Sequence, residues 1–282
     1  MKNTKIYKLY FLLLLFVFSS CETTNLDVVA DPISINPDNA DIDLFLNSVQ
    51  FGLANFVTGV EGSGFDGASE FGMEAVRMLH GFGPSYRQLN DPGDFNQMWA
   101  NAYSNVLINI RSMNLIAEPA GQYTHIAMGQ IIEAYVMMTL VDFFGDVPYS
   151  EAFTGASGNF NPITDSGASI YSAIDQLLQS AITNLNLTPI ISEPSTDLYY
   201  GGDKTKWIKL ANTLRLKLYL QTRLANEDGF GASTSASQIN ALIAGGDLIM
   251  DSSDDFVFRW STNIAAPDSR HPYFEKNYGG VI

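Results

Sequence analysis

The chain has 282 residues, of which 46% are hydrophobic; this is enough apolar material for a sizeable core and excludes a globally disordered protein. The formal net charge is −15, which argues against a nucleic-acid-binding protein because such proteins need a basic face to neutralise phosphates. A single cysteine excludes an internal disulfide and a cysteine-rich zinc site.

The N-terminus has the layout of a bacterial export signal. Three lysines precede an unbroken apolar run from Leu9 to Phe18, which is too short to span a membrane and has the length of a signal-peptide core. Two serines and the only cysteine, Cys21, follow directly. This order resembles the lipobox of a bacterial lipoprotein, in which the cysteine is acylated and the chain is cut before it. We therefore expect residues 1–20 to be removed and residues 21–40 to form a flexible tether; the alternative is an ordinary signal peptide with an incidental cysteine.

Apolar residues recur at steps of three or four through most of residues 41–282, the period of amphipathic helices. Asp94 and Gly145 are expected to cap helices at their N-terminal and C-terminal ends, respectively. A glycine-rich stretch covers residues 59–67. Helices are predicted from Asp41 to Phe56, Asp94 to Met113, Gln122 to Phe144, Ile170 to Leu185, Asp203 to Leu218 and Ser237 to Ala244.

The predicted fold class is mostly α. Helical hairpins over residues 94–144 and 165–225 resemble a tetratricopeptide stack, although no clean 34-residue repeat is present. An irregular, loop-rich part accompanies them. Only Asp255 to Trp260 alternates in the manner of a strand, so a little β structure is expected near the C-terminus.

The helix that begins at Asp203 is unusually basic for an acidic chain. A helix lying on a membrane surface is one interpretation. The bases scatter over three sides of a helical wheel, however, which favours internal pairing with carboxylates. The six basic residues are Lys204, Lys206, Lys209, Arg215, Lys217 and Arg223.

A search for catalytic, cofactor and metal sites predicts none. Residues 62–67 match G-x-G-x-x-G, but a helix is predicted before them where a dinucleotide site needs a strand. His80, His125 and His271 have no partner at ligand spacing and are interpreted as structural. Asp66 and neighbouring glutamates could form a carboxylate pair of the kind that glycoside hydrolysis needs, but in so acidic a chain such pairs arise by chance.

Three segments, in this order, resemble the SusD/RagB family of Bacteroidetes surface lipoproteins. The first, Leu140 to Ala152, reads LVDFFGDVPYSEA and resembles the hallmark of the family. The second, Ile170 to Leu177, reads IYSAIDQL, and the third, Lys206 to Leu216, reads KWIKLANTLRL. They follow a lipoprotein-like signal, and the resemblance covers nearly all of residues 21–282.

The resemblance implies a SusD-like α-helical domain over residues 41–282 and no catalysis. It implies a lipid anchor in the outer membrane, with the protein facing the cell exterior. Such proteins capture glycans, or in some cases peptides, for a SusC-type TonB-dependent transporter. Family members are usually much longer, so we expect this chain to be C-terminally truncated and to hold the N-terminal part of the family fold.

The loop region 59–95 contains the residue types that bind sugars. Aromatic faces stack on pyranose rings, and polar side chains bond the hydroxyl groups. Phe65, Arg77, Tyr86 and Arg87 are the candidate ligand contacts. In the alternative interpretation the aromatic rings pack beneath the loop and the arginines pair with acids. Peptide capture and glycan hydrolysis remain as other functions.

Lipidation of Cys21 can be tested directly. Mass spectrometry of the membrane-extracted protein should find an acylated Cys21 at the N-terminus, because the short apolar run ends there. Cys21→Ala should move the protein out of the membrane fraction, since acyl chains supply the anchor. An intact Met1, or a first residue other than Cys21, would contradict this prediction.

Overall fold

The computed structural model describes residues 41–59, 67–79, 91–225, 230–263 and 270–272. Helices make up most of this part of the chain, and its only β pairing is an antiparallel bridge between Val147 and Asp165. The α-helices are α2 (Ile42–Thr58), α3 (Ala68–Ala75), α4 (Asn96–Ala100), α5 (Ile108–Ala120), α6 (Tyr123–Phe144), α7 (Gly167–Leu185), α8 (Lys204–Gln221) and α9 (Ala232–Gly245). The 3-10 turns η3 (Pro92–Phe95), η5 (Gly155–Ser157) and η6 (Ser252–Asp254) and the π-helical segment η4 (Asn101–Leu107) complete the elements of the described residues.

The predicted helices are confirmed, and several of their ends with them. Asp41 caps α2 and Asp203 caps α8, each by accepting hydrogen bonds from backbone N–H groups of the first turn. Gly145 ends α6 at a φ of 76°, a region that favours glycine. The two hairpins, α5 with α6 and α7 with α8, are also present.

Three predicted details are wrong. Asp94 does not cap a helix but lies in η3, where its carboxylate accepts a hydrogen bond from the Asp91 N–H at 2.7 Å. Helix α9 begins at Ala232 rather than near Ser237, since the residues between them carry no apolar stripe that would mark its start. The segment from Asp255 to Trp260 forms no strand within the described residues, because its aromatic rings pack on helices and a loop rather than beside another extended segment.

Helices α4, η4 and α5 follow one another without a break, and the π-helical middle lies where α2 approaches closely. A Cβ on Gly52 would come within 3.1 Å of Val106 and 3.3 Å of the Asn105 carbonyl. Asn101 is fully buried at this contact and donates to the carbonyl of Asn55 on α2. The missing side chain at Gly52 therefore lets the two helices pack at close range.

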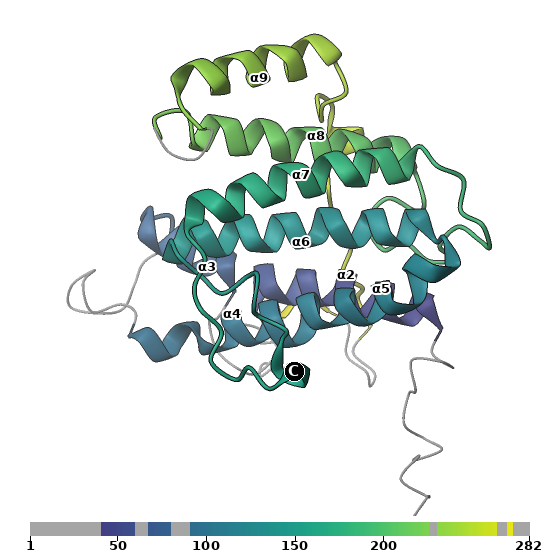
Figure 1. Cartoon of the computed structure of the whole chain (residues 1–282), viewed down its shortest axis with the longest axis horizontal. Coiled ribbons are helices and arrows are strands. Elements are labelled where there is room, and N and C mark those ends of the chain that lie inside the picture. The colour runs from purple at the N-terminus through teal and green to yellow at the C-terminus, as the bar shows by residue number, and fades with distance from the viewer. Residues whose placement is uncertain (1–40, 60–66, 80–90, 226–229, 264–269, 273–282) are drawn as a thin grey trace, which may run out of the picture. The chain divides into compact units, whose positions relative to one another are not determined.

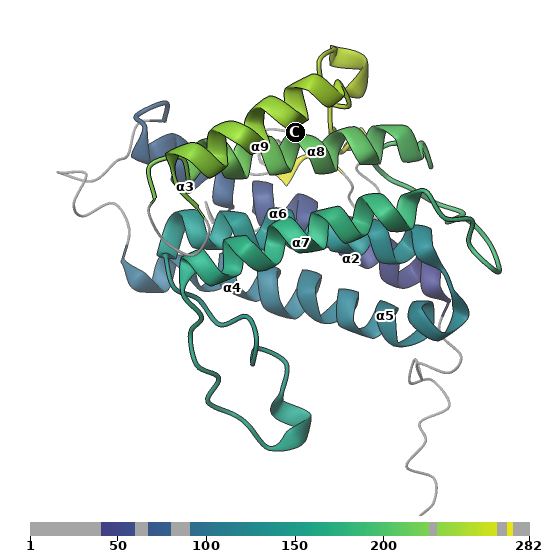
Figure 2. The same cartoon turned by 45° about the horizontal axis from the view of Figure 1, so that its top comes forward.

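The helices pack side by side in chain order. In Figure 1, α5, α6, α7, α8 and α9 follow one another from the lower to the upper part of the view, and in Figure 2, where the top is turned forward, α7 lies in front of α6 and α9 in front of α8. Each consecutive pair is in contact, and α2 packs against both α5 and α6. This is the stack of hairpins expected from the sequence.

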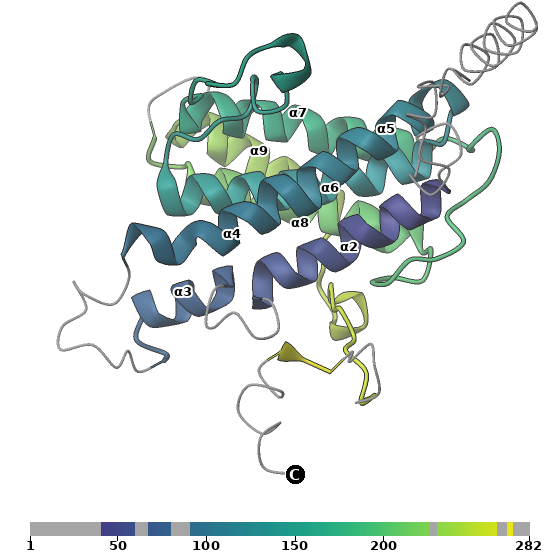
Figure 3. The same cartoon turned by 90° about the horizontal axis from the view of Figure 1, so that it is seen from below.

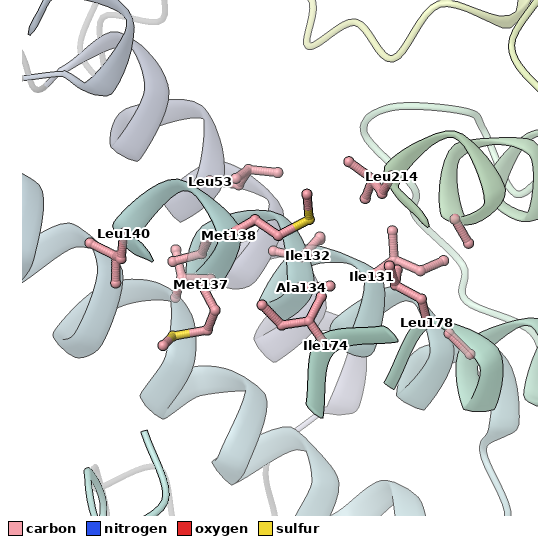
Figure 4. Packing of buried hydrophobic residues seen from close by; sticks show 14 of the residues in the cluster. Leu53, Ile131, Ile132, Ala134, Met137, Met138, Leu140, Ile174, Leu178 and Leu214 are labelled. Carbon is pink, nitrogen blue, oxygen red and sulfur yellow. The ribbon is translucent and has the colours of Figure 1, made fainter. Parts of the chain in front are cut away.

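Helix α6 is apolar on nearly every side and forms the centre of the core. It contacts α2, α5, α7 and α8, and its residues Ile131 and Met137 are almost fully buried. Figure 4 shows Leu53 of α2, Leu178 of α7 and Leu214 of α8 gathered around it. By length and composition α6 would also qualify as a membrane span, but its burial in this core accounts for its apolar character.

One buried carboxylate lies within this apolar helix. Glu133 is 2% exposed, and its carboxylate accepts hydrogen bonds from both terminal nitrogens of Arg111, each at 2.6 Å. The Tyr149 hydroxyl donates to the same carboxylate at 2.8 Å. A buried carboxylate is tolerated only when it is paired and hydrogen-bonded. These contacts therefore hold α5, α6 and the loop after α6 in one register.

Most of the bases of α8 pair with carboxylates, which confirms the interpretation of internal pairing. Lys206 and Arg223 donate instead to the backbone carbonyls of Ser253 and Leu220. Each of the four paired acids comes from a different part of the chain, so α8 ties these parts together. The ion pairs are Lys204–Glu193 at 2.9 Å, Lys209–Asp254 at 2.7 Å, Arg215–Asp175 at 2.7 Å and Lys217–Asp142 at 3.0 Å.

Two of these pairs differ mainly in burial and give a matched test. Arg215→Met should lower the free energy of unfolding by about 3 kcal/mol, because it leaves the largely buried Asp175 without its cation. Lys217→Met breaks an ion pair whose side chains are 45% and 28% exposed, and should cost less than about 1 kcal/mol. Urea denaturation measures both values, and equal losses would contradict the burial argument.

Candidate ligand-binding site

A cavity of about 310 Å³ opens beside the C-terminal half of α2. This volume lies at the lower end of the usual range for small-molecule sites, ~300–1,000 Å³. Figure 3 shows chain segments from the C-terminal part, in yellow, next to α2. The cavity is lined by Leu53, Ala54, Val57, Thr58, Tyr135, Tyr199, Phe256, Val257, Phe258, Trp260 and His271.

The loop before α8 is fixed by one carboxylate. Asp197 accepts hydrogen bonds from Gln50 of α2 at 3.1 Å and from the Trp207 indole of α8 at 2.8 Å. It also accepts from the N–H groups of Tyr199 and Gly202, at 3.0 and 2.9 Å. Gln50 and Trp207 are fully buried, so water competes little for these bonds. They hold Tyr199 in the cavity wall, where its hydroxyl donates to the Gln50 carbonyl at 3.2 Å.

The turn η6 is held against the N-terminal part of α8. Lys209 forms its ion pair with Asp254, and this hydrogen bond raises the pKa of the lysine, which stays charged. Lys206 donates to the Ser253 carbonyl at 2.7 Å, and the Tyr200 hydroxyl donates to the Asp254 carbonyl at 2.8 Å. These three contacts place the chain that follows η6 over the end of α2.

The segment after η6 turns its aromatic rings toward the cavity. Phe256, Phe258 and Trp260 are partly buried, whereas Val257 and Arg259 between them are exposed. The alternation recognised in the sequence is therefore real, although the segment is not a strand. It serves here to place three rings on one side of an extended chain.

These rings join others in a continuous aromatic cluster. Phe256 stacks on Tyr199 with ring centroids 4.0 Å apart and planes 13° from parallel. Phe258 and Trp260 meet edge to face at 4.8 Å, and Trp260 lies 5.5 Å from the His271 ring. Such edge and stacked contacts stabilise aromatic groups beyond simple burial. The cavity wall is thus built from rings that support one another.

The cavity carries few polar groups and, among the described residues, no Asp, Glu, Lys or Arg in its lining. Burial raises the pKa of Tyr135 and of Tyr199, so both remain neutral hydroxyl groups. Burial also lowers the pKa of His271, which favours its neutral imidazole. In the part of the chain that is described, no three His, Cys, Asp or Glu side chains gather where they could hold a metal ion.

This arrangement suits an uncharged ligand with an apolar face and a polar edge. Aromatic faces offer large contact area to C–H groups, and a few hydroxyl and imidazole groups orient the polar edge. A sugar ring has both features. A strongly charged ligand would lose its hydration without gaining an ion pair in the lining.

Of the residues predicted to contact the ligand, only Arg77 is among the described residues, and it is not part of the cavity lining. Cys21, Phe65, Tyr86 and Arg87 lie outside the described residues. Arg77 is exposed, follows α3 and has a φ of 63°, in the left-handed region.

The glycine-rich loop after α2 nevertheless begins and ends beside the cavity. A Cβ on Gly67 would come within 2.4 Å of the backbones of Thr58 and Gly59, so the two ends of the loop are in direct contact. Ser69 donates to the Val57 carbonyl at 2.7 Å and secures this junction. Val57 and Thr58 both line the cavity, so both loop ends lie at its rim.

Tyr135, Tyr199 and His271 line the cavity but were not predicted from the sequence as ligand contacts. Phe256 to Trp260 stood out in the sequence only by its alternation, which predicted a strand. Three aromatic residues in alternation after an acidic turn are a usable signal for an aromatic surface. The contributions of Tyr135 and Tyr199 had no local signal, because only the packing of distant segments brings them together.

Comparison with known families gives one match over most of the chain. Residues 44–276 match the sequence model of a SusD-like family that is described as starch-binding and associating with the outer membrane. No curated protein matches the chain.

Solved structures share the fold. A SusD/RagB family protein of Bacteroides thetaiotaomicron is 21% identical over 85% of this chain and 44% of its own, with a TM-score of 0.52. An outer-membrane protein of Bacteroides vulgatus, described with a role in nutrient binding, is 23% identical over 84% of this chain and 47% of its own, with a TM-score of 0.60. A chitin-binding protein is 25% identical over 76% of this chain and 45% of its own, with a TM-score of 0.57. The chain spans less than half the length of each of these structures.

The burial of His271 predicts a pH effect on stability. Its pKa in the folded protein lies below the ordinary value of 6.5, so the unfolded chain binds the proton more readily. The free energy of unfolding should therefore fall as the pH drops below 6.5 and through the folded-state pKa. Denaturation of His271→Gln at the same pH values should show a smaller fall. A His271 imidazole that titrates at or above 6.5 by NMR would contradict this account.

Proposed function

The chain belongs to the SusD-like family described as starch-binding and associating with the outer membrane, and from that membership we propose that it captures neutral glycans. The proposed site is the aromatic cavity beside α2. The sugar ring lies against the faces of Phe258 and Trp260, and the hydroxyl groups of Tyr199 and Thr58 face its polar edge.

The observation that carries this proposal is the composition of the cavity. Its lining combines several aromatic rings with a few neutral polar groups, and the described part contains no charged side chain. Neutral sugars need contact area and a few hydrogen bonds rather than ion pairs. The net charge of −15 also disfavours acidic polysaccharides, which the protein as a whole repels.

We further propose that the captured glycan is passed to a SusC-type TonB-dependent transporter. The supporting argument is family membership, together with the lipoprotein-like signal that ends at Cys21. In this proposal a lipid on Cys21 keeps the protein at the outer membrane, facing the exterior.

We propose binding without turnover. Glycoside hydrolysis ordinarily needs two carboxyl groups flanking the scissile bond, and the described cavity lining supplies none. Peptide capture is the alternative function. It would require groups that satisfy a peptide backbone, whereas this lining is mostly apolar carbon.

The loop residues remain part of the proposal. Phe65 and the pair Tyr86–Arg87 would add further contacts, and the loop that holds Phe65 has both its ends at the cavity rim. Arg77 is kept as a proposed contact to a longer ligand that extends beyond the cavity.

Calorimetry with maltohexaose and chitohexaose tests the site. Trp260→Ala should weaken binding of the preferred sugar by about 1 kcal/mol, roughly fivefold in Kd, because one ring face is lost. The matched control is Arg259→Ala, whose exposed side chain is adjacent in sequence but lies outside the lining. It should leave Kd unchanged.

Four results would contradict the proposal. Both sugars could fail to bind the full chain, or Trp260→Ala could bind as tightly as the parent while keeping its melting temperature. Release of new reducing ends from either sugar would show turnover and exclude a purely binding role. Tighter binding of a mixed peptide digest would favour the alternative function.

A further inference from the structure

A second, smaller cavity of about 200 Å³ lies between α8 and α9. It shares no lining residue with the aromatic cavity and differs from it in chemistry. Figures 1 and 2 show α9 lying along α8 at the end of the helical stack. Its lining residues are Asn212, Arg215, Gln238, Ala241, Leu242, Gly245 and Asp247.

The polar side chains in this cavity keep unused hydrogen-bonding groups. Within the described part of the chain, Asn212, Gln238 and Asp247 make no side-chain hydrogen bond or ion pair, and all three line the cavity. Arg215 uses its Nε to bond Asp175 at 2.7 Å, and its terminal amino groups have no acceptor there. Two amides, one guanidinium and one carboxylate therefore offer both donors and acceptors to one small space.

The cavity is held in shape by bonds outside it. Asp175 accepts from Arg215 and also from the Tyr219 hydroxyl at 3.0 Å and the Gln179 amide at 2.6 Å, which fixes the guanidinium. Thr213 accepts from the Ile249 N–H at 3.0 Å and pins the chain after α9 onto α8. The Arg215 guanidinium, which is already in position, therefore loses little conformational freedom on binding.

The charges of the cavity disfavour an anionic ligand. Asp175 already compensates the positive charge of Arg215, so the guanidinium acts as a hydrogen-bond donor rather than as a free cation. Asp247 adds a carboxylate, which repels anions and accepts hydroxyl protons. Leu242 is 9% exposed and, with Ala241, gives the cavity an apolar side.

We propose that this cleft is a second carbohydrate site, which binds a single neutral sugar ring through its vicinal hydroxyl groups. Each hydroxyl group of a sugar both donates and accepts hydrogen bonds. In the cavity, the two amides do the same, the guanidinium donates and the carboxylate accepts. The C–H face of the ring lies on Ala241 and Leu242. The volume is below the ~300 Å³ usual for larger ligands, which limits the site to one ring. The inference does not depend on the function proposed for the aromatic cavity.

NMR of the ¹⁵N-labelled chain tests this site with glucose and N-acetylglucosamine as probes. The side-chain NH₂ signals of Asn212 and Gln238 are assigned through Asn212→Asp and Gln238→Glu. Both signals should shift together and saturably with at least one probe. Trp260→Ala should show the same shifts with the same Kd, because its ring belongs to the other cavity.

Gln238→Leu should weaken this binding about tenfold, the effect of losing one good hydrogen bond. Its helical circular dichroism should match that of the parent. No saturable shift of either amide would overturn the proposal, as would shifts that vanish in Trp260→Ala. Glycine binding with equal affinity would overturn it too, because the cleft would then recognise a zwitterion.

Discussion

The burial of α6 on nearly all sides is the constraint on which the rest of the structure depends. A helix with hardly any polar face must be covered all round, and α2, α5, α7 and α8 do this. The packing of these four helices around α6 fixes the order of the stack and brings the end of α2 beside Tyr135. The pairing of Glu133 with Arg111 and Tyr149 satisfies the one carboxylate that this burial would otherwise leave unpaired.

Helix α8 links this core to the aromatic cavity. Its bases pair with acids from α6, α7, the preceding loop and η6, so one helix ties together segments far apart in sequence. The Lys209–Asp254 pair and the bonds of Asp197 set the positions of the two chain segments that carry the rings. In a chain of net charge −15, the bases of this helix serve internal contacts rather than a surface for anionic partners.

Features with local causes could be predicted from the sequence, and features with distant causes could not. Apolar spacing, the helix starts at Asp41 and Asp203 and the glycine at the end of α6 act within a few residues, and all are confirmed, whereas the N-cap predicted at Asp94 is not. The acidic net charge and the helical wheel together predicted that the basic residues of α8 pair with carboxylates. Which carboxylates they meet depends on how distant segments pack. The strand interpretation of residues 255–260 was wrong because alternation reports which side is buried, not whether another strand lies alongside. The cavity was missed because five separate segments build it, and residues 60–66 and 80–90 of the loop region favoured instead lie outside the described residues.

The central claim is that the rings of the aromatic cavity bind the ligand by their faces. Saturation-transfer NMR tests it most directly, with the protein deuterated everywhere except in its aromatic side chains and with maltohexaose or chitohexaose as the ligand. The account predicts strong transfer from the aromatic protons to the C–H protons of the sugar rings. Measurable binding of the sugar without transfer from the aromatic protons would contradict it.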